Sequence, residues 1–342
     1  MSRKITIIPV YVIAHFVVDF ACAFLMFRVL RDTAYGYISL LIYNFCAFAL
    51  QMPIGLLADR FNRNAVCAAI GCGFVALAFP FGGLPIVAAV LAGIGNGMFH
   101  IGGGIEVLNC GRGKPLLLGI FVSPGALGIY LGTILGKQKL IPSVFAVIGL
   151  IIMMLLILTL QYIERRSFLS DNAALSLQSL SSPWVLAAVT SLLLVVILRS
   201  YIGMTSTFAW KGNATWATLY AVAVVLGKVF GGILAIPLGI KKTCILSLGM
   251  AAGLFLFSDV PVLGIAAVFF FNMTMPLTLW AVARLISGSK GFSFGLLTFG
   301  LFLGFVPPYL ELAPLFSTTI GFTIASGLSL LLLLYGLRRA VE

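Results

Sequence analysis

The loop Gly55–Arg63 (GLLADRFNR) joins two apolar runs and carries the clearest local pattern in the sequence. A second stretch, Gly232–Lys241 (GILAIPLGIK), closes another apolar run in the same order: a glycine, a leucine–alanine pair, a turn and a basic cluster. The first glycines of the two stretches are 177 residues apart, close to half of the 342-residue chain. This spacing predicts an internal repeat and therefore two related halves.

Composition places the chain in a membrane. Hydrophobic residues make up 61% of it and charged residues 9%, and the mean hydropathy is +1.17. Soluble domains are about 45–50% apolar and about 25% charged, and disordered chains combine low hydrophobicity with high net charge. Both classes are excluded, and we expect an all-α integral membrane protein.

Twelve apolar runs are long enough to cross a bilayer, which takes about 20 residues. A polar stretch separates the first six from the last six, so we predict an N-terminal six-helix half at 1–162, a cytoplasmic linker at 163–183 and a C-terminal half at 184–342. With the repeat, this predicts twelve transmembrane helices in two pseudo-symmetric halves. The expected spans are 6–27, 36–57, 65–83, 86–109, 116–136, 141–162, 184–206, 213–238, 243–258, 261–284, 291–310 and 315–337.

Basic residues predict the orientation of these spans. The formal net charge is +12, and the Lys and Arg residues sit in short clusters between apolar runs. With twelve spans, fourteen of them fall in the loops on one side and five on the other. Cytoplasmic loops carry the excess, so both termini are predicted to be cytoplasmic. A basic stripe with interleaved aromatic residues is missing from the sequence, so nucleic acid is not an expected partner.

The 55–63 loop resembles the cytoplasmic loop signature of the major facilitator superfamily, which usually reads G-x-L-A-D-R-x-G-R-[RK]. Three further stretches are similar to the fosmidomycin-resistance type of exporter: His15–Phe20 (HFVVDF), Gly95–His100 (GNGMFH) and Leu198–Tyr201 (LRSY). Ile101–Gly104 stands where that type has a proline–acid pair. The resemblance implies a major facilitator fold, transport by alternating access and a bacterial cytoplasmic membrane.

Ionisable side chains within spans are costly and are therefore candidate functional residues. At 1.5 Å per residue, Asp19, Arg199 and Asn272 lie roughly 20–22 Å from the cytoplasmic ends of their spans. We predict that Arg199 binds a carboxylate or phosphonate through its planar donors and that Asp19 carries a coupling proton. The alternative for Asp19 and Arg199 is a static pair joining two helices. For Asn272 it is a helix–helix hydrogen bond rather than a substrate contact.

The two histidines share a second level. His15 and His100 both lie roughly 13 Å from the cytoplasmic ends of spans one and four. His15 and Asp19 are spaced i, i+4 and share one helix face. The histidines are predicted to relay protons and contact substrate, with Asn96 as a further substrate-binding residue, and hydrogen-bonded packing is the alternative. The resemblance implies that spans one, four, seven and ten, which hold all of these residues, line the central cavity.

A conformational latch is expected at the cytoplasmic ends of the helices. The 55–63 loop resembles the family's latch, which holds one gate closed through charge and helix-end contacts; a solvated loop is the alternative. Glu106 is expected to meet a basic loop residue such as Arg112. In the fifth span, Ser123–Gly125 and glycines at four-residue spacing predict close helix packing and resemble a degraded antiporter motif. The predicted latch residues are Gly55, Asp59, Arg60, Arg63 and Glu106.

The sequence shows no nucleotide-binding loop, metal cluster or nucleophile triad, so an ion gradient must drive uphill transport. No cofactor, metal or enzymatic activity is expected, and the six cysteines form no CxxC or CxxH pair. We predict proton-coupled export of a small anionic or polar compound by a monomer whose other partner is membrane lipid. Uptake of a small carboxylate, export of lipophilic cations, and a non-transporting receptor or scramblase remain alternatives.

Overall fold

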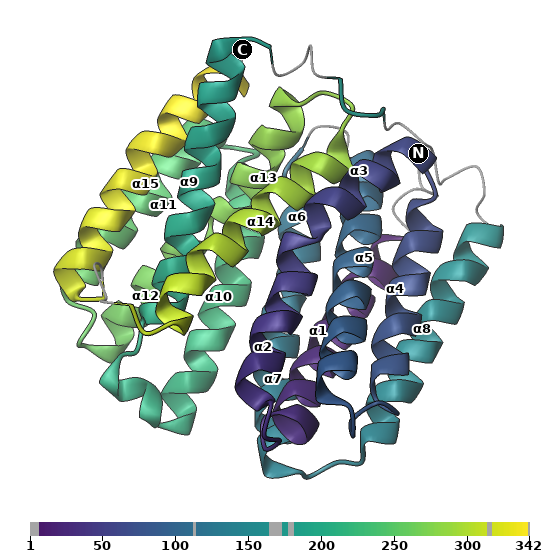
Figure 1. Cartoon of the computed structure of the whole chain (residues 1–342). Coiled ribbons are helices and arrows are strands. Elements are labelled where there is room, and N and C mark those ends of the chain that lie inside the picture. The colour runs from purple at the N-terminus through teal and green to yellow at the C-terminus, as the bar shows by residue number, and fades with distance from the viewer. Residues whose placement is uncertain (1–6, 112–113, 164–172, 177–180, 313–316, 341–342) are drawn as a thin grey trace. The chain divides into compact units, whose positions relative to one another are not determined.

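The computed structural model describes residues 7–111, 114–163, 173–176, 181–312 and 317–340, and every regular element in those ranges is a helix (Figure 1). The chain folds into two compact units. Unit 1 comprises Met1–Arg112, Pro124–Ala174 and Gly288–Gly295, and unit 2 comprises Gly113–Ser123, Leu175–Ser287 and Leu296–Glu342.

Unit 1 is built from the helices that precede the predicted linker, with one exception. The π-helical turns Met26–Leu30 and Phe45–Ala49 continue two of its helices. Its helices are α1 (Ile8–Leu25), α2 (Gly36–Asn44), α3 (Gln51–Phe61), α4 (Asn64–Ala78), α5 (Pro85–Gly111), α7 (Pro124–Gln138) and α8 (Ser143–Ile163).

Unit 2 contains the exception, α6, together with most of the later helices. A short 3-10 helix, Ala209–Gly212, connects two of them, and α14 (Lys290–Tyr309) begins in unit 1 and continues into unit 2. The other helices of unit 2 are α6 (Leu116–Val122), α9 (Pro183–Thr205), α10 (Ala214–Leu234), α11 (Ile240–Phe255), α12 (Pro261–Asn272), α13 (Thr274–Leu285) and α15 (Thr319–Ala340).

Ten helical segments in the described ranges are long and apolar enough to cross a membrane. They coincide with ten of the twelve expected spans. The other two expected spans contain α4, with 15 residues, and α11, with 16. At 1.5 Å per residue these helices are shorter than the roughly 30 Å hydrocarbon core. Twelve spans in two symmetric halves therefore remain a prediction.

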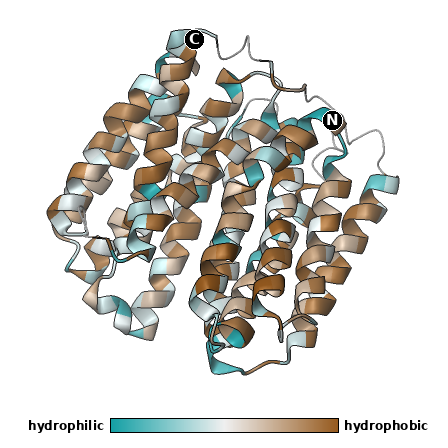
Figure 2. Ribbon diagram, in the orientation of Figure 1, coloured by the Kyte–Doolittle hydropathy of each residue, from teal (hydrophilic) through white to brown (hydrophobic). Residues whose placement is uncertain are grey.

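Many large hydrophobic side chains are exposed on the outer faces of the helices. On α8, Ile151, Ile152 and Leu155 are 41%, 47% and 53% exposed. Figure 2 shows hydrophobic residues along the helices and hydrophilic residues gathered toward helix ends and loops. Apolar faces of this extent are suited to contact with lipid, because in water they would favour aggregation.

Glycines bring α7 against α1 in unit 1. A Cβ on Gly128 would lie 2.5 Å from the Phe16 carbonyl oxygen, and one on Gly132 would overlap the Phe20 carbonyl oxygen. Gly136 continues the same buried face. The close helix packing predicted from the glycine spacing is therefore present, and it fixes the rotation of α1, which carries His15 and Asp19.

Two short segments join the unit opposite to the one expected from their position in the chain. In unit 2, α6 packs on α10 through Gly119, whose Cβ would lie 2.6 Å from the Lys228 carbonyl oxygen. The first residues of α14 belong to unit 1, where their backbone amides bind Asp59. The predicted linker at 163–183 lies largely outside the described residues.

Candidate functional site

Four polar side chains meet between α1 and α5 in unit 1. Asp19 Oδ2 is 3.2 Å from His15 Nε2, and Asp19 Oδ1 is 3.6 Å from His100 Nε2. The two histidine Nε2 atoms are 2.9 Å apart, although 85 residues separate them in sequence. Asn96 Nδ2 donates to Asp19 Oδ1 at 3.0 Å. We call these four residues the histidine–aspartate cluster.

One hydrogen bond fixes the tautomer of His100. Its Nδ1 lies 2.9 Å from the backbone carbonyl oxygen of Asn96, which can only accept. Nδ1 therefore carries a proton, and in the neutral ring Nε2 presents a lone pair. That lone pair faces His15 Nε2 and the Asp19 carboxylate. The cluster thus directs one imidazole lone pair and a carboxylate at the same small volume.

The cluster is buried, and α7 leaves room for it. His15, Asp19, Asn96 and His100 are 4%, 7%, 2% and 9% exposed. A Cβ at Gly125 would overlap Asp19 Oδ2 and lie 2.5 Å from His15 Nε2. A side chain at this position would therefore collide with both atoms, so glycine is needed for the close approach of α7.

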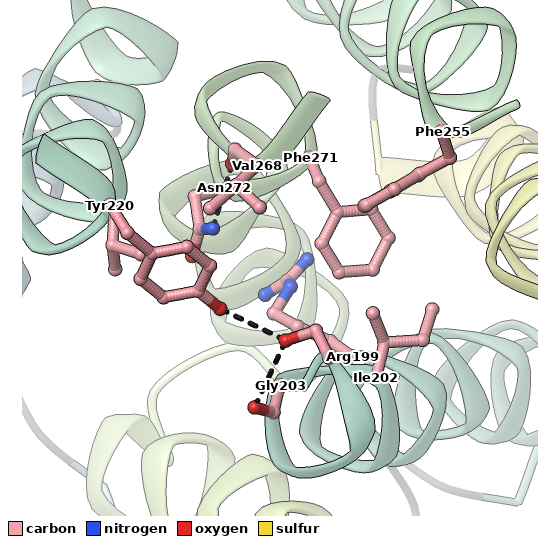
Figure 3. Close-up of a pocket in the computed structure, with 10 residues that line it drawn as sticks. Arg199, Ile202, Gly203, Tyr220, Phe255, Val268, Phe271 and Asn272 are labelled. Atoms are coloured by element: carbon pink, nitrogen blue, oxygen red, sulfur yellow. Dashed lines mark hydrogen bonds between the residues drawn. The ribbon is translucent and has the colours of Figure 1, made fainter. Parts of the chain in front are cut away.

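Unit 2 contains a cavity of about 220 Å³ between α9, α10, α11 and α12 (Figure 3). Most of its wall is apolar, and the polar atoms come from a few side chains that converge on it. Figure 3 shows the Arg199 guanidinium pointing into the space between Tyr220, Phe271 and Asn272. The lining residues are Arg199, Ile202, Gly203, Ser206, Tyr220, Val224, Phe255, Val268, Phe271 and Asn272.

Arg199 is a buried cation whose protein contacts are neutral. It is 8% exposed, and its Nη2 donates to Thr274 Oγ1 at 2.5 Å and to Thr278 Oγ1 at 3.4 Å. Its buried Nε makes no hydrogen bond, and within the described part of unit 2 it forms no salt bridge. Since a buried charge without a counter-charge is costly, the guanidinium has unused capacity for an anion.

A second cation lies beside the same wall. Tyr220 OH is 3.0 Å from Ser206 Oγ. Lys211 Nζ donates to the Ser206 carbonyl oxygen at 2.9 Å and lies 4.0 Å from the Tyr220 ring centroid. Burial lowers the pKa of the Lys211 ammonium below its ordinary value. Arg199 therefore lines the cavity, and Lys211 contacts two of its other lining residues, Ser206 and Tyr220.

Sequence reasoning identified Arg199 and Asn272 but missed their partners. Asn272 lines the cavity, and its Nδ2 donates to the Val268 carbonyl oxygen at 2.8 Å within its own helix. Thr274 and Thr278 follow at i, i+4 just after Met273, where the predicted tenth span is broken into α12 and α13. The i, i+4 spacing of these two hydroxyl side chains could have indicated a polar helix face in the sequence, whereas no local pattern distinguishes Tyr220 as a cavity residue.

The latch residues lie in different surroundings. Asp59 is 1% exposed, and its Oδ1 and Oδ2 accept from the backbone amides of Gly291 and Phe292, each at 2.8 Å. A Cβ on Gly55 would overlap the Gly291 carbonyl oxygen, so glycine permits this approach. These contacts lie at the first turn of α14, where a carboxylate is stabilised by the helix dipole.

The remaining latch residues divide into exposed and buried ones. Arg60 and Arg63 are exposed, and the Arg60 guanidinium carbon lies 6.0 Å from the Phe61 ring centroid. Glu106 is 3% exposed within α5. Its expected partner Arg112 lies outside the described residues.

Asp19 belongs to unit 1 and Arg199 to unit 2. The expected coupling of proton transfer at Asp19 to substrate binding at Arg199 remains a prediction.

No protein-family model matches the sequence, and no curated protein matches it. Solved structures do match. One is FucP, a major facilitator superfamily transporter, in the outward conformation: 16% identity, covering 96% of this chain and 99% of that chain, with a TM-score of 0.63. Another is a variant of the E. coli fucose:proton symporter FucP, with 13% identity, 97% and 99% coverage and a TM-score of 0.67.

These similarities cover nearly the full length of both chains. The protein therefore has the fold of major facilitator superfamily transporters, and its apolar helices fit a multi-pass membrane protein. The sequence identity is too low to transfer a substrate or a coupling ion. The similarity to the fosmidomycin-resistance type stays a resemblance of three short stretches.

Proposed function

We propose that this protein is a secondary active transporter, not an enzyme, that moves a small anionic or polar organic compound by alternating access. The observation that carries the proposal is Arg199, a guanidinium that points into a cavity and has no carboxylate partner within the described part of unit 2. Removing a cation from water costs several kcal/mol unless an anion compensates it. A substrate carboxylate or phosphonate supplies that compensation and accepts from the planar guanidinium donors.

The size and charge of the cavity support a small anion. Its volume of about 220 Å³ is below the range of roughly 300–1,000 Å³ typical of drug-sized ligands. Lys211 adds a second positive charge near the wall formed by Ser206 and Tyr220. A lipophilic cation would be repelled by both basic residues, so the multidrug alternative is disfavoured.

Proton coupling is assigned to the histidine–aspartate cluster. Asp19 and His15 are within 3.2 Å of each other, and His100 extends the contact to α5. The cluster can hold a proton between groups that are buried and hydrogen-bonded to one another. Export is the proposed direction, because the glycine face of α7 resembles the antiporter motif and packs directly on α1.

The remaining parts of the proposal come from the charge pattern. Fourteen basic residues against five in alternate loops support cytoplasmic termini, and the resemblance to the fosmidomycin-resistance type supports a bacterial cytoplasmic membrane. The proposed protein works as a monomer in contact with membrane lipid, uses no cofactor beyond an ion gradient and binds no nucleic acid.

A thermal-shift screen tests the anion site. Purified protein is heated with small carboxylates, phosphonates, neutral compounds and lipophilic cations. A ligand at 100 times its Kd stabilises the folded state by about 2.7 kcal/mol. We expect anions to raise Tm and Arg199→Ala to remove that rise. Lys228→Met is the matched control, because Lys228 is also a buried cation of unit 2 but does not line the cavity.

Two results of this screen would contradict the anion site. One is an anion-induced Tm rise that survives Arg199→Ala. The other is stabilisation by lipophilic cations alone. Loss of the rise in Lys228→Met as well would show a general effect of buried charge, and would also count against Arg199 as the specific site.

Flux measurements test the coupling and the direction. The protein is reconstituted in vesicles with a pH gradient and a stabilising anion. We expect net movement of the anion in the direction opposite to the flow of protons. Asp19→Asn should abolish this net transport while still permitting exchange of labelled anion. Anion movement together with protons would replace export by symport. Unchanged gradient-driven transport in Asp19→Asn would remove Asp19 from the coupling step.

A further inference from the structure

The histidine–aspartate cluster has the composition of a metal centre. His15, Asp19 and His100 each offer one ligand atom, and these atoms all lie within 4.8 Å of one another. We propose that the cluster binds one divalent transition-metal ion of the zinc class through His15 Nε2, His100 Nε2 and a carboxylate oxygen of Asp19. Binding itself does not depend on the proposed transport function.

The distances between the ligand atoms suit such an ion. Bonds of about 2.0–2.1 Å to a tetrahedral Zn²⁺ place neighbouring ligand atoms about 3.3 Å apart. The two histidine Nε2 atoms are 2.9 Å apart, His15 Nε2 is 3.2 Å from Asp19 Oδ2, and His100 Nε2 is 3.6 Å from Asp19 Oδ1. The two histidines thus approach different oxygens of the carboxylate, and with one ligand atom from each residue all separations stay within 4.8 Å. Two imidazole nitrogens and one carboxylate oxygen form a common three-residue zinc ligand set, which leaves the fourth position for water or a further ligand.

The surroundings hold the ligand atoms in the orientation that a metal requires. Histidine ligands usually donate their second ring N–H to a carbonyl or carboxylate. His100 Nδ1 does so to the Asn96 carbonyl oxygen at 2.9 Å, which leaves Nε2 as the lone pair. Asn96 Nδ2 also donates to Asp19 Oδ1 at 3.0 Å, which orients the carboxylate. One residue, Asn96, therefore orients two of the three ligands.

Gly125 lets the α7 backbone approach the ligand atoms closely. A Cβ there would lie against Asp19 Oδ2 and His15 Nε2, the two ligand atoms contributed by α1. The His15 and His100 rings are nearly perpendicular, at 86°, with centroids 4.5 Å apart. This arrangement directs the Nε2 atoms at each other rather than stacking the rings.

The sequence does not contain the spacing that usually reveals a metal site. The ligands come from two helices, with 85 residues between the histidines.

Ligation requires a carboxylate and two imidazole lone pairs, so a metal ion and the coupling proton would exclude each other. If the proposed function holds, zinc would therefore block proton-coupled transport.

The test is metal binding by purified protein. The chain has only two histidines, both in the cluster, so a tag without histidine makes every imidazole ligand informative. Co²⁺ is titrated and its visible absorption recorded, and the Zn²⁺-loaded protein is examined by X-ray absorption. We expect one ion per chain, with nitrogen and oxygen neighbours at about 2.0 Å and no sulfur shell at about 2.3 Å.

Variants separate the ligands from their surroundings. His15→Gln, His100→Gln and Asp19→Asn should each weaken binding at least 100-fold. Cys22→Ser is the matched control, because its Sγ lies 3.6 Å from Asn96 Nδ2 but is not a proposed ligand. Cys22→Ser should bind normally. Gel filtration and helix content check that every variant is folded, independently of the anion response at Arg199.

Several results would overturn the metal site. They are no binding by the unaltered protein, a sulfur shell in the X-ray absorption, or unchanged affinity in a folded His100→Gln variant. A missing anion response in protein that binds metal would instead count against the proposed substrate cavity alone.

Discussion

The histidine–aspartate cluster of unit 1 and the Arg199 cavity of unit 2 are both buried and polar, but they are satisfied differently. In the cluster, a carboxylate is surrounded by two imidazoles and an amide of the same unit, all within 3.6 Å. In the cavity, the Arg199 guanidinium donates to two threonine hydroxyls, and its Nε makes no hydrogen bond with the residues that the structure describes. The carboxylate of the first region contacts polar side chains of its own unit, whereas the guanidinium of the second has no charged partner within the described part of unit 2.

This difference indicates which role each region can perform. Polar groups that satisfy one another can exchange a small cation without opening a large space, which suits a proton or a metal ion. For a buried cation beside a cavity of about 220 Å³, an anion that enters the cavity would offset the desolvation free energy. The comparison therefore supports the proposal that unit 1 handles ions and unit 2 binds the substrate.

The largest expected effect comes from Gly125→Val, which should abolish metal binding. The added side chain must displace Asp19 Oδ2 and His15 Nε2, and overpacking of this kind costs about 1–3 kcal/mol of stability. The anion-induced Tm rise at Arg199 should remain. Gly249→Val is the control, because nothing lies within 4 Å of a Cβ at Gly249. Metal binding of normal affinity in Gly125→Val would contradict a metal site at the histidine–aspartate cluster.

Arg199→Met tests the unsatisfied state of the cavity. An apolar side chain removes the cost of burying an uncompensated charge, and even the replacement of buried ion pairs by apolar residues is often neutral or stabilising by about 1–4 kcal/mol. Without ligand, we expect the free energy of unfolding in detergent to stay the same or rise. Denaturant titration measures it. A fall of several kcal/mol would mean that a protein group already compensates Arg199.

Asn96→Ala tests the satisfied state of the cluster and should affect metal binding less than Gly125→Val does. Loss of the hydrogen bond to Asp19 Oδ1 is expected to lower the free energy of unfolding by about 1.5–3 kcal/mol, the range for bonds to charged groups. Metal affinity should fall about 10–100-fold, because Asn96 orients the ligands without being one. An unchanged stability would show that Asn96 does not support the carboxylate.

Much of the candidate site could be located from the sequence because its residues violate the local pattern. Asp19, Arg199 and both histidines stand out as polar residues in apolar runs, and the i, i+4 spacing of His15 and Asp19 already predicts their contact. The partners of these residues could not be located in the same way. Tyr220 and Ser206 look like ordinary residues near the end of a span, and only the packing of α9 on α10 makes them a cavity wall.

The membrane environment, the helical class and the places where polar groups enter the apolar helices could all be predicted from the amino-acid sequence. These properties follow from composition and from helical periodicity, which act over one or two turns. Tertiary structure alone decided that His100 meets His15, that Gly125 stands beside them and that Asp59 binds amides 232 and 233 residues away. Such contacts depend on which helices become neighbours and how each is rotated; the glycine spacing of α7 predicts a close approach but not the helix that is approached.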